Sequence, residues 1–155
     1  MKNSITIESP IGRLTIQEED GFLTNILFGE SDRPSKNSII SPIIQKTINE
    51  LEEYFMGRRK TFSIPLKPKG TEFQQKVWEA LTKIPYKQTR SYKEIANAVN
   101  CPMGSRAVGN ANNRNPLPII IPCHRVIGAN GLLVGYAGGL DIKQRLLKIE
   151  SDNVD

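Results

Sequence analysis

The sequence predicts an α/β N-terminal domain, a small antiparallel sheet with one helix, followed by a mostly α-helical domain. Three observations support this architecture. Over residues 4–28, apolar and polar side chains alternate with the period of half-buried strands. Beyond Gly70, apolar residues recur every three or four positions, as on an amphipathic helix. Segment 65–70 has the proline and glycine content of a linker, so we expect domains over residues 1–66 and 67–155.

Strands come first in the N-terminal half, and a helix follows them. Two turn signals, Pro10-Ile11-Gly12 and Asp20-Gly21, divide residues 4–28 into separate strands. Ser41-Pro42 then opens a helix, because serine caps helix N-termini and proline fits the first turn. Gly57 ends this helix, and residues 61–66 indicate one more short strand. Nothing in this half suggests chemistry.

Capped helices dominate the second half. Thr71 precedes a helix whose apolar residues fall on one face. Ser91 caps the next helix, and Glu94, three residues later, completes a capping box. A tight turn at residues 101–104 leads into a further helix that begins near Ser105. Two short helices joined by a tight turn form a helix-turn-helix pattern, although any helical hairpin resembles it.

The net charge of +5 is concentrated in the second half. Up to Leu66, eight Lys/Arg face nine Asp/Glu, whereas beyond it thirteen face seven. Between residues 87 and 125 the only acid is Glu94, against six basic residues: Lys87, Arg90, Lys93, Arg106, Arg114 and Arg125. This basic band favours a polyanionic partner, and the alternative is a set of scattered, solvated surface charges.

Composition excludes several classes of protein. No apolar run approaches the ~20 residues of a membrane span, and no basic-then-apolar leader marks an export signal. Two cysteines, Cys101 and Cys123, are too few for a disulfide scaffold or an ordinary zinc site. We therefore expect a soluble cytoplasmic protein with free thiols, and no metal, cofactor or membrane partner.

The stretch "PIIIPCHRV" (residues 118–126) places the only histidine, His124, beside Cys123. The apolar run before it has the character of a buried strand, with Cys123 at the inner end. Consecutive strand residues face opposite sides, so the imidazole reaches the thiol only through a turn or a bridging water. A carboxylate should hold the far ring nitrogen. Glu150, which ends an apolar helix, is one of seven acids in this half of the chain, with Glu72, Glu79, Glu94, Asp141, Asp152 and Asp155.

A glycine-rich loop follows this stretch. Asn130-Gly131 between apolar residues predicts a hairpin turn. Gly135, Gly138 and Gly139 surround Tyr136, and glycines at these positions permit the backbone to approach a flat ligand. A plain turn is the alternative interpretation of this loop.

These features together resemble the O6-alkylguanine-DNA alkyltransferases (methylated-DNA–protein-cysteine methyltransferases), whose active-site motif matches "PCHRV". The pieces fall in the family's order and spacing across about eighty residues: Gly70-Thr71-Glu72-Phe73, Ser91-Tyr92, Ser105 to Gly109, Asn115-Pro116, Pro122 to Val126, Gly135 to Gly139, and Leu146-Leu147 to Glu150. The resemblance implies a ribonuclease H-like first domain and a winged-helix-like DNA-binding second domain.

The resemblance also implies a reaction. Cys123 would accept the alkyl (methyl) group from O6 of guanine in DNA, irreversibly and once per molecule. His124 would deprotonate the thiol through a water, Glu150 would orient the imidazole, and Tyr92 would donate to the departing guanine. The expected partner is double-stranded DNA containing O6-alkylguanine, with O4-alkylthymine as a second candidate substrate. The protein is expected to act as a monomer.

Two further sets of residues follow from the resemblance. Arg106 would fill the stack vacated by a flipped base, and its helix would enter the minor groove. DNA contact is thereby implied for Arg106, Ala107, Gly109, Asn112 and Arg114. The substrate pocket and a hinge are implied at Asn115, Pro118, Tyr136, Ala137 and Gly138. Several relatives carry a hydroxyl at the position of Ala137, so here a backbone N–H would serve the O6 atom and larger alkyl groups would fit.

Three other functions compete with this one. A Cys–His hydrolase normally uses a histidine distant in sequence from the thiol, and it needs an oxyanion hole. A DNA-binding sensor without chemistry would have its nucleophile replaced, but Cys123 is present. A helix-turn-helix regulator would leave the buried "IIIPCHR" unexplained.

Overall fold

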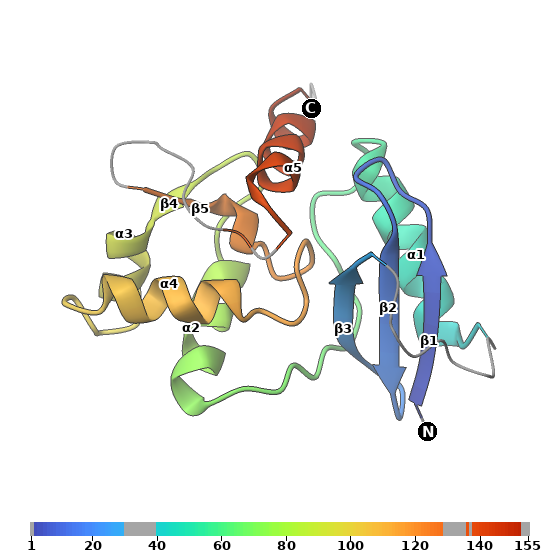
Figure 1. Ribbon diagram of the computed structural model, residues 1–155, viewed down its shortest axis with the longest axis horizontal. Coiled ribbons are helices and arrows are strands. Elements are labelled where there is room, and N and C mark those ends of the chain that lie inside the picture. Colours follow the sequence, from blue (N-terminus) through green and yellow to red (C-terminus); the bar gives the residue numbers. More distant parts are fainter. Residues whose placement is uncertain (1, 30–39, 129–135, 137, 153–155) are drawn as a thin grey trace. The chain divides into compact units, whose positions relative to one another are not determined.

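The computed structural model describes residues 2–29, 40–128, 136 and 138–152. The chain divides into two units, Met1–Lys69 and Gly70–Asp155 (Figure 1). Among the described residues, no helix combines the length and apolar character needed to cross a bilayer.

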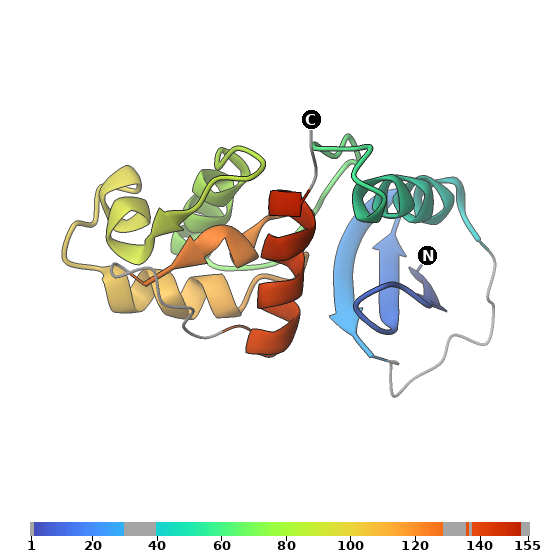
Figure 2. The ribbon, with the colours of Figure 1, turned by 90° about the horizontal axis from the view of Figure 1, so that it is seen from above.

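The N-terminal unit is a three-stranded antiparallel sheet with one helix, as predicted. Strands β1 (Lys2–Ile7), β2 (Leu14–Glu19) and β3 (Phe22–Phe28) pair in the order β1-β2-β3. Asp20 and Gly21 both have positive φ, 53° and 84°, which suits the two-residue turn between β2 and β3. Helix α1 (Pro42–Phe55) lies across one face of the sheet (Figure 2).

The capping of α1 and its apolar face explain its position. The Ser41 hydroxyl accepts from the Ile44 N–H at 3.2 Å, and Pro42 occupies the first turn. The helix buries Ile44 and Leu51 against the sheet, where Ile16 is likewise fully buried. Burial of each such side chain contributes about 1.5–3 kcal/mol, so the core rather than helix propensity holds α1 in place.

A buried carboxylate ties the end of α1 to the segment that follows it. Glu50 accepts hydrogen bonds from the Ser63 N–H and hydroxyl, both at 2.9 Å. The Lys46 and Arg59 side chains lie 3.6 Å from its oxygens. These partners satisfy a charge that would otherwise be costly to bury.

The strand expected over residues 61–66 is wrong. Only Leu66 makes a bridge, with Leu23, beside two backbone hydrogen bonds: Leu23 N–H to Pro65 C=O and Lys67 N–H to Leu23 C=O, both 2.9 Å. Pro65 has no N–H to give to a ladder, and proline is tolerated only where pairing ends. The chain therefore touches the sheet at one point and continues toward the second unit.

The C-terminal unit is mostly helical. Its elements are α2 (Glu72–Thr82), β4 (Arg90–Ser91), α3 (Tyr92–Ala98), α4 (Ser105–Asn113), a 3₁₀ turn η1 (Cys123–Arg125), β5 (Val126–Ile127) and α5 (Leu140–Asp152). Both predicted caps are present: Thr71 forms a capping box with Gln74, and Ser91 forms one with Glu94. Helices α2, α3 and α4 pack on one another (Figure 1), which confirms the helix-turn-helix expected for α3 and α4.

A tight turn joins α3 to α4. The Gly104 N–H donates to the Cys101 C=O at 2.8 Å, and a Cβ at Gly104 would lie 2.5 Å from the Cys101 sulfur. Any larger residue at position 104 would require the Cys101 side chain to move. Cys101, which begins this turn, is a half-buried free cysteine.

The buried strand expected before Cys123 is wrong, because residues 117–122 form a buried turn. Pro116, Pro118 and Pro122 lack N–H groups, so this segment could not pair in a sheet. Ile119 has a φ of +76°, outside the strand region. The segment is nevertheless buried throughout, as its apolar composition predicted.

Candidate active site

The turn carrying Cys123 is held by side-chain amides from the end of α4. Asn115 Nδ2 donates to the Ile121 C=O at 2.8 Å, and Asn115 Oδ1 accepts from the Leu117 N–H at 2.9 Å. Asn112 Nδ2 donates to the Cys123 C=O at 3.2 Å. Both amides replace the hydrogen bonds that a strand would have given the buried backbone. The nucleophile candidate is thus fixed directly to the second helix of the helix-turn-helix.

The η1 turn allows neighbouring side chains to contribute to one site. Cys123, His124 and Arg125 form one 3₁₀ turn, so the strict alternation of a strand does not apply to them. All three are buried: Cys123 is 4% exposed and His124 is fully enclosed.

His124 meets the carboxylate of Glu150 on α5. The distance from His124 Nε2 to Glu150 Oε2 is 2.6 Å, and both side chains are buried. Because an ionised carboxylate only accepts, this contact assigns the ring proton to Nε2 and leaves the Nδ1 lone pair as the basic site. Nδ1 has no hydrogen-bond partner within the part of the chain that the structure describes.

Glu150 is also bound by Arg125. Arg125 Nε lies 3.0 Å from Oε1 and Nη2 lies 3.1 Å from Oε2, a bidentate pair, and the Lys87 N–H donates to Oε1 at 3.2 Å. Hydrogen bonds and charges from His124 and Arg125 outweigh burial and lower the pKa of Glu150 to about 2. Glu150 is therefore a carboxylate at neutral pH.

Burial sets the protonation of the other groups. It lowers the pKa of His124, despite the opposing effect of Glu150, so the imidazole is neutral. It also raises the pKa of the Cys123 thiol, although hydrogen bonds from Asn115 and Tyr136 and the charge of Lys143 oppose that rise. The resting site thus holds a protonated thiol and a neutral base, and the thiol needs that base to become a thiolate.

The short parallel pairing of β4 with β5 brings Tyr92 to this site. Arg90 pairs with Val126 and Ser91 with Ile127, so α3 starts directly beside the η1 turn. Burial, and next the charge of Cys123, raise the pKa of Tyr92, which keeps the phenol a donor. The Nζ of the fully buried Lys143 lies 5.9 Å from the Tyr92 ring centroid.

The residues expected at a DNA surface separate into two groups. Arg106, Ala107 and Arg114 are exposed on α4 or at its end, and Gly109 is half-buried under the Tyr92 ring. Asn112, by contrast, is 1% exposed and faces the Cys123 backbone, so it does not lie on that surface. Helical spacing explains the difference, because Asn112 lies four positions after the buried Val108 and shares its face.

The pocket residues are only partly covered by the structure. Pro118 is buried, and Tyr136 and Gly138 are half-buried. Ala137 lies outside the described residues, as do the Asn130-Gly131 turn and Gly135.

Two charged residues of the site escaped sequence reasoning. Arg125 was counted in the basic band, but it is 5% exposed and turned toward Glu150. Lys143 was not singled out. Its spacing of seven from Glu150, with Leu146 between them, places it on the buried face of α5, and this spacing was the available signal.

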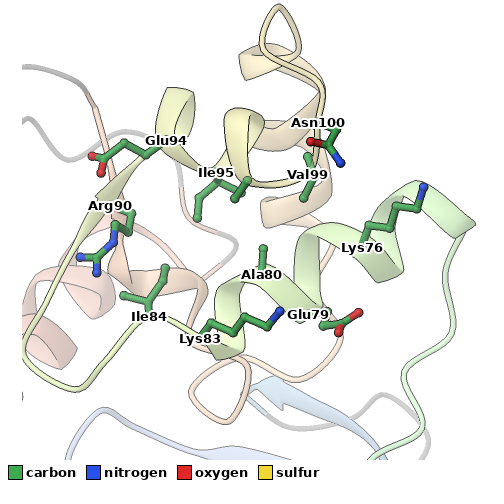
Figure 3. A pocket seen from close by; sticks show the side chains of 11 residues that line it. Lys76, Glu79, Ala80, Lys83, Ile84, Arg90, Glu94, Ile95, Val99 and Asn100 are labelled. Carbon is green, nitrogen blue, oxygen red and sulfur yellow. The ribbon is translucent and has the colours of Figure 1, made fainter.

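A separate groove of about 550 Å³ lies between α2 and α3 (Figure 3). Its lining mixes bases and acids over apolar side chains, and it includes Lys76, Glu79, Lys83, Arg90 and Glu94. None of the predicted catalytic residues lines it.

Within the described ranges, no cluster of three or more His, Cys, Asp or Glu side chains is arranged to hold a metal ion.

The protonation of His124 and Glu150 predicts acid lability of the C-terminal unit. The folded pKa of His124 lies below its ordinary 6.5, and that of Glu150 lies below its ordinary 4.5. The unfolded state therefore binds more protons, and the free energy of unfolding decreases as the pH is lowered. The loss begins as pH drops below about 6.5 for His124, and that from Glu150 follows between about 4.5 and about 2. Trp78, the only tryptophan, is buried in this unit and reports its unfolding by fluorescence.

Urea titrations followed by Trp78 fluorescence at about pH 7 and about pH 5 measure this loss. The unfolding midpoint is expected to fall between the two conditions for the native chain and to fall less for His124→Gln, which has no imidazole to protonate. Equal falls in both proteins would show that His124 is not the group responsible.

Comparison with known proteins agrees with this geometry. Residues 4–68 match the family described as "6-O-methylguanine DNA methyltransferase, ribonuclease-like domain", and residues 72–152 match its "DNA binding domain". The chain is 49% identical over 152 residues to the methylated-DNA–protein-cysteine methyltransferase of Methanosarcina mazei, covering 96% of each. It is also 49% identical over 153 residues to the constitutive one of Bacillus subtilis, covering 94% of this chain and 93% of the relative.

Solved structures show the same fold. Mycobacterium tuberculosis OGT in complex with DNA superposes with a TM-score of 0.89 at 44% identity, covering 98% of this chain and 94% of that one. An O6-methylguanine DNA methyltransferase from Methanococcus jannaschii gives a TM-score of 0.74 at 28% identity, covering 97% and 95%. The predicted two-part architecture and the predicted family are therefore confirmed, and the chain belongs to the 6-O-methylguanine DNA methyltransferase family.

Proposed function

We propose that this chain repairs DNA directly, by transferring the methyl group from O6 of guanine in a duplex to its own Cys123. The observation that carries the proposal is the buried set of Cys123, neutral His124 and ionised Glu150, fixed to a helix-turn-helix. Relatives named methylated-DNA–protein-cysteine methyltransferase, and a similar structure in complex with DNA, support the substrate.

The first step is deprotonation of the thiol. Burial keeps Cys123 protonated, so a base must act at the moment of attack. The Cys123 proton passes through a water to the Nδ1 of His124, whose Nε2–H is held by Glu150. Glu150 stays ionised and stabilises the imidazolium that forms, as the acid of a nucleophile–base–acid triad does.

The second step is attack of the thiolate on the methyl carbon. The S–C bond forms as the C–O6 bond breaks, and the electron pair of that bond remains with the guanine. Tyr92 donates a hydrogen bond to the departing base, where negative charge develops; the base then takes up a proton from solvent, and His124 releases its proton to solvent. The product is a thioether, which has no carbonyl for water to attack. Each molecule therefore reacts once.

Access to the site requires the base to leave the helix. A buried thiol cannot reach a stacked guanine, so the nucleotide flips out at a cost of a few kcal/mol. Helix α4 would lie in the minor groove, with the small Ala107 and Gly109 permitting close approach, and Arg106 would fill the vacated stack. Tyr136 and the backbone near Ala137 would wall the flipped base, and Asn115 would act as the hinge between α4 and the pocket.

Arg106→Ala is expected to slow repair of a methylated duplex by at least about tenfold, because unstacking is no longer compensated. Transfer from the free O6-alkylguanine base, which needs no flipping, should stay within about twofold. The ratio of the two single-turnover rate constants is the quantity to measure.

Arg114→Ala is the matched control for Arg106, since Arg114 is also exposed at α4 but is proposed only to contact phosphate. It should weaken duplex binding and reduce its salt dependence while leaving that ratio near the native value. Equal slowing of both substrates by Arg106→Ala would remove its role in flipping.

The proposal also covers the location, the oligomeric state and the substrates of the protein. We propose activity in the cytoplasm as a monomer, on O6-alkylguanine and as a second substrate on O4-alkylthymine, with chemistry in residues 67–155. A label carried on the O6-methyl group of a duplex tests the function directly. It should appear on the protein, whereas a regulator or sensor would leave it on the DNA and a hydrolase would release it to water.

A further inference from the structure

Arg125 is a basic residue of the "PCHRV" stretch that the reaction described above does not use. Its guanidinium is 5% exposed and makes the two contacts to Glu150. It also donates to the Ile84 C=O at 2.8 Å and lies 5.6 Å from the centroid of the Tyr86 ring. Every side of this cation is thus occupied by the protein, so it is not part of a DNA-binding surface.

The position of Arg125 matters because Glu150 accepts hydrogen bonds from two groups at once: the permanent cation Arg125 and His124, which becomes a cation when protonated. Oε2 is shared between His124 Nε2 at 2.6 Å and Arg125 Nη2 at 3.1 Å. A buried carboxylate with no other partner would draw a proton onto the imidazole and form an imidazolium–carboxylate pair. The permanently charged guanidinium satisfies the carboxylate first, because arginine does not deprotonate in proteins.

The other groups around His124 act in the same direction. From α5 it faces Glu150, which favours its protonation, and Lys143, which opposes it. From its own turn it adjoins Arg125, which also opposes protonation, and Cys123, which is a neutral thiol at rest. The segment after α2 contributes the Tyr86 ring against Arg125 and the Lys87 N–H to Glu150. Glu150 is therefore the one group named here that would charge the imidazole.

We propose that Arg125 is a positioning residue which, by pairing with Glu150, keeps His124 neutral and its Nδ1 free to take the Cys123 proton. The inference rests on the proposed methyl transfer for its kinetic consequence, but the protonation of His124 can be measured without any substrate. Glu150 orients the imidazole ring, and the charge of Arg125 prevents the Glu150 carboxylate from stabilising a second proton on that ring. The base is thereby available at neutral pH.

Arg125→Met tests this role, because methionine keeps much of the length and removes the charge. The variant should transfer methyl groups more than about tenfold more slowly than the native chain near pH 6.5, and recover to within about threefold near pH 9. Arg125→Lys restores a cation without the bidentate fork and should recover most of the loss at the lower pH. A slowing that is the same at every pH would overturn the proposal and leave Arg125 a purely structural residue.

The chain has one histidine, so nuclear magnetic resonance reads the protonation of His124 without assignment ambiguity. Its ring signals should titrate at higher pH in Arg125→Met than in the native chain, and Arg125→Met/Glu150→Gln should restore the native behaviour, because the carboxylate is gone as well. If Arg125→Met does not fold, Arg125→Gln, which also removes the charge but can still donate to Glu150, takes its place in both measurements with the same expected results. An unchanged titration in folded Arg125→Met would overturn the proposal.

Arg59→Met is the matched control, because Arg59 pairs with the buried Glu50 in the N-terminal unit. It should leave both the pH–rate profile and the His124 titration unchanged. If the native chain transfers no methyl group, the proposed function fails, but a shifted His124 titration in Arg125→Met would still support the role of Arg125.

Discussion

We expect Cys123→Ser to abolish methyl transfer while DNA binding stays within about threefold of the native affinity. A serine hydroxyl at its ordinary pKa is a far weaker nucleophile than a thiol, so a loss of at least about a thousandfold is expected. Cys123 is 4% exposed, whereas Arg106 and Ala107 are exposed on α4, so the exchange does not alter the residues that are proposed to face DNA. Single-turnover transfer and duplex binding, measured on the same preparation, separate the two properties.

Cys101→Ser is the control for this substitution. Cys101 is the other free thiol, half-buried in the turn before α4, and it has no role in the proposed reaction. Its replacement should leave the transfer rate unchanged. Loss of DNA affinity in Cys123→Ser as large as its loss of transfer would contradict the separation of nucleophile and DNA surface.

Glu150→Gln is expected to have the second-largest effect, because it acts on both catalysis and stability. The amide cannot stabilise the imidazolium that forms on His124, so transfer should slow by about a hundredfold or more. The guanidinium of Arg125 also loses its carboxylate in a buried site, which should lower the free energy of unfolding by about 3–5 kcal/mol. Trp78 fluorescence measures the stability, and single-turnover transfer well below the unfolding temperature measures the rate.

Glu50→Gln distinguishes the two effects. Glu50 is also a buried carboxylate with hydrogen-bond and ion-pair partners, but it lies in the N-terminal unit. This variant should lose stability and keep the native transfer rate under conditions where it is folded. A comparable fall in rate for Glu50→Gln would show that the effect of Glu150→Gln reflects stability alone.

Local signals in the sequence were enough to predict most of the elements. Ser41, Thr71 and Ser91 cap their helices because serine and threonine hydroxyls satisfy the free N–H groups of a first turn. The period-2 pattern around Ile5 and Ile16 predicts strands, and Ile5 and Ile16 are paired partners in β1 and β2. Such signals depend only on neighbours along the chain, so no tertiary information is required.

The errors arose where contacts distant in sequence decide the structure. The apolar run at residues 118–121 is buried as predicted, but burial alone does not distinguish a strand from a turn fixed by Asn115. The helical spacing of Asn112 from Val108 places it on the buried face of α4, but its hydrogen bond to the Cys123 carbonyl depends on how the chain folds back after α4. Arg125 reads as part of a basic band until α5, some twenty-five positions later, supplies Glu150.

The stoichiometry of methyl transfer tests the central claim most directly. The protein is incubated for a long period with a large excess of duplex containing O6-methylguanine, and intact mass and peptide mapping follow the product. Because a thioether has no route back to the thiol, we predict that the reaction stops at one methyl group per active molecule, on Cys123, with Cys101 unmodified. Continued turnover beyond one equivalent, or a methyl group placed elsewhere, would contradict the account of Cys123 as the final acceptor.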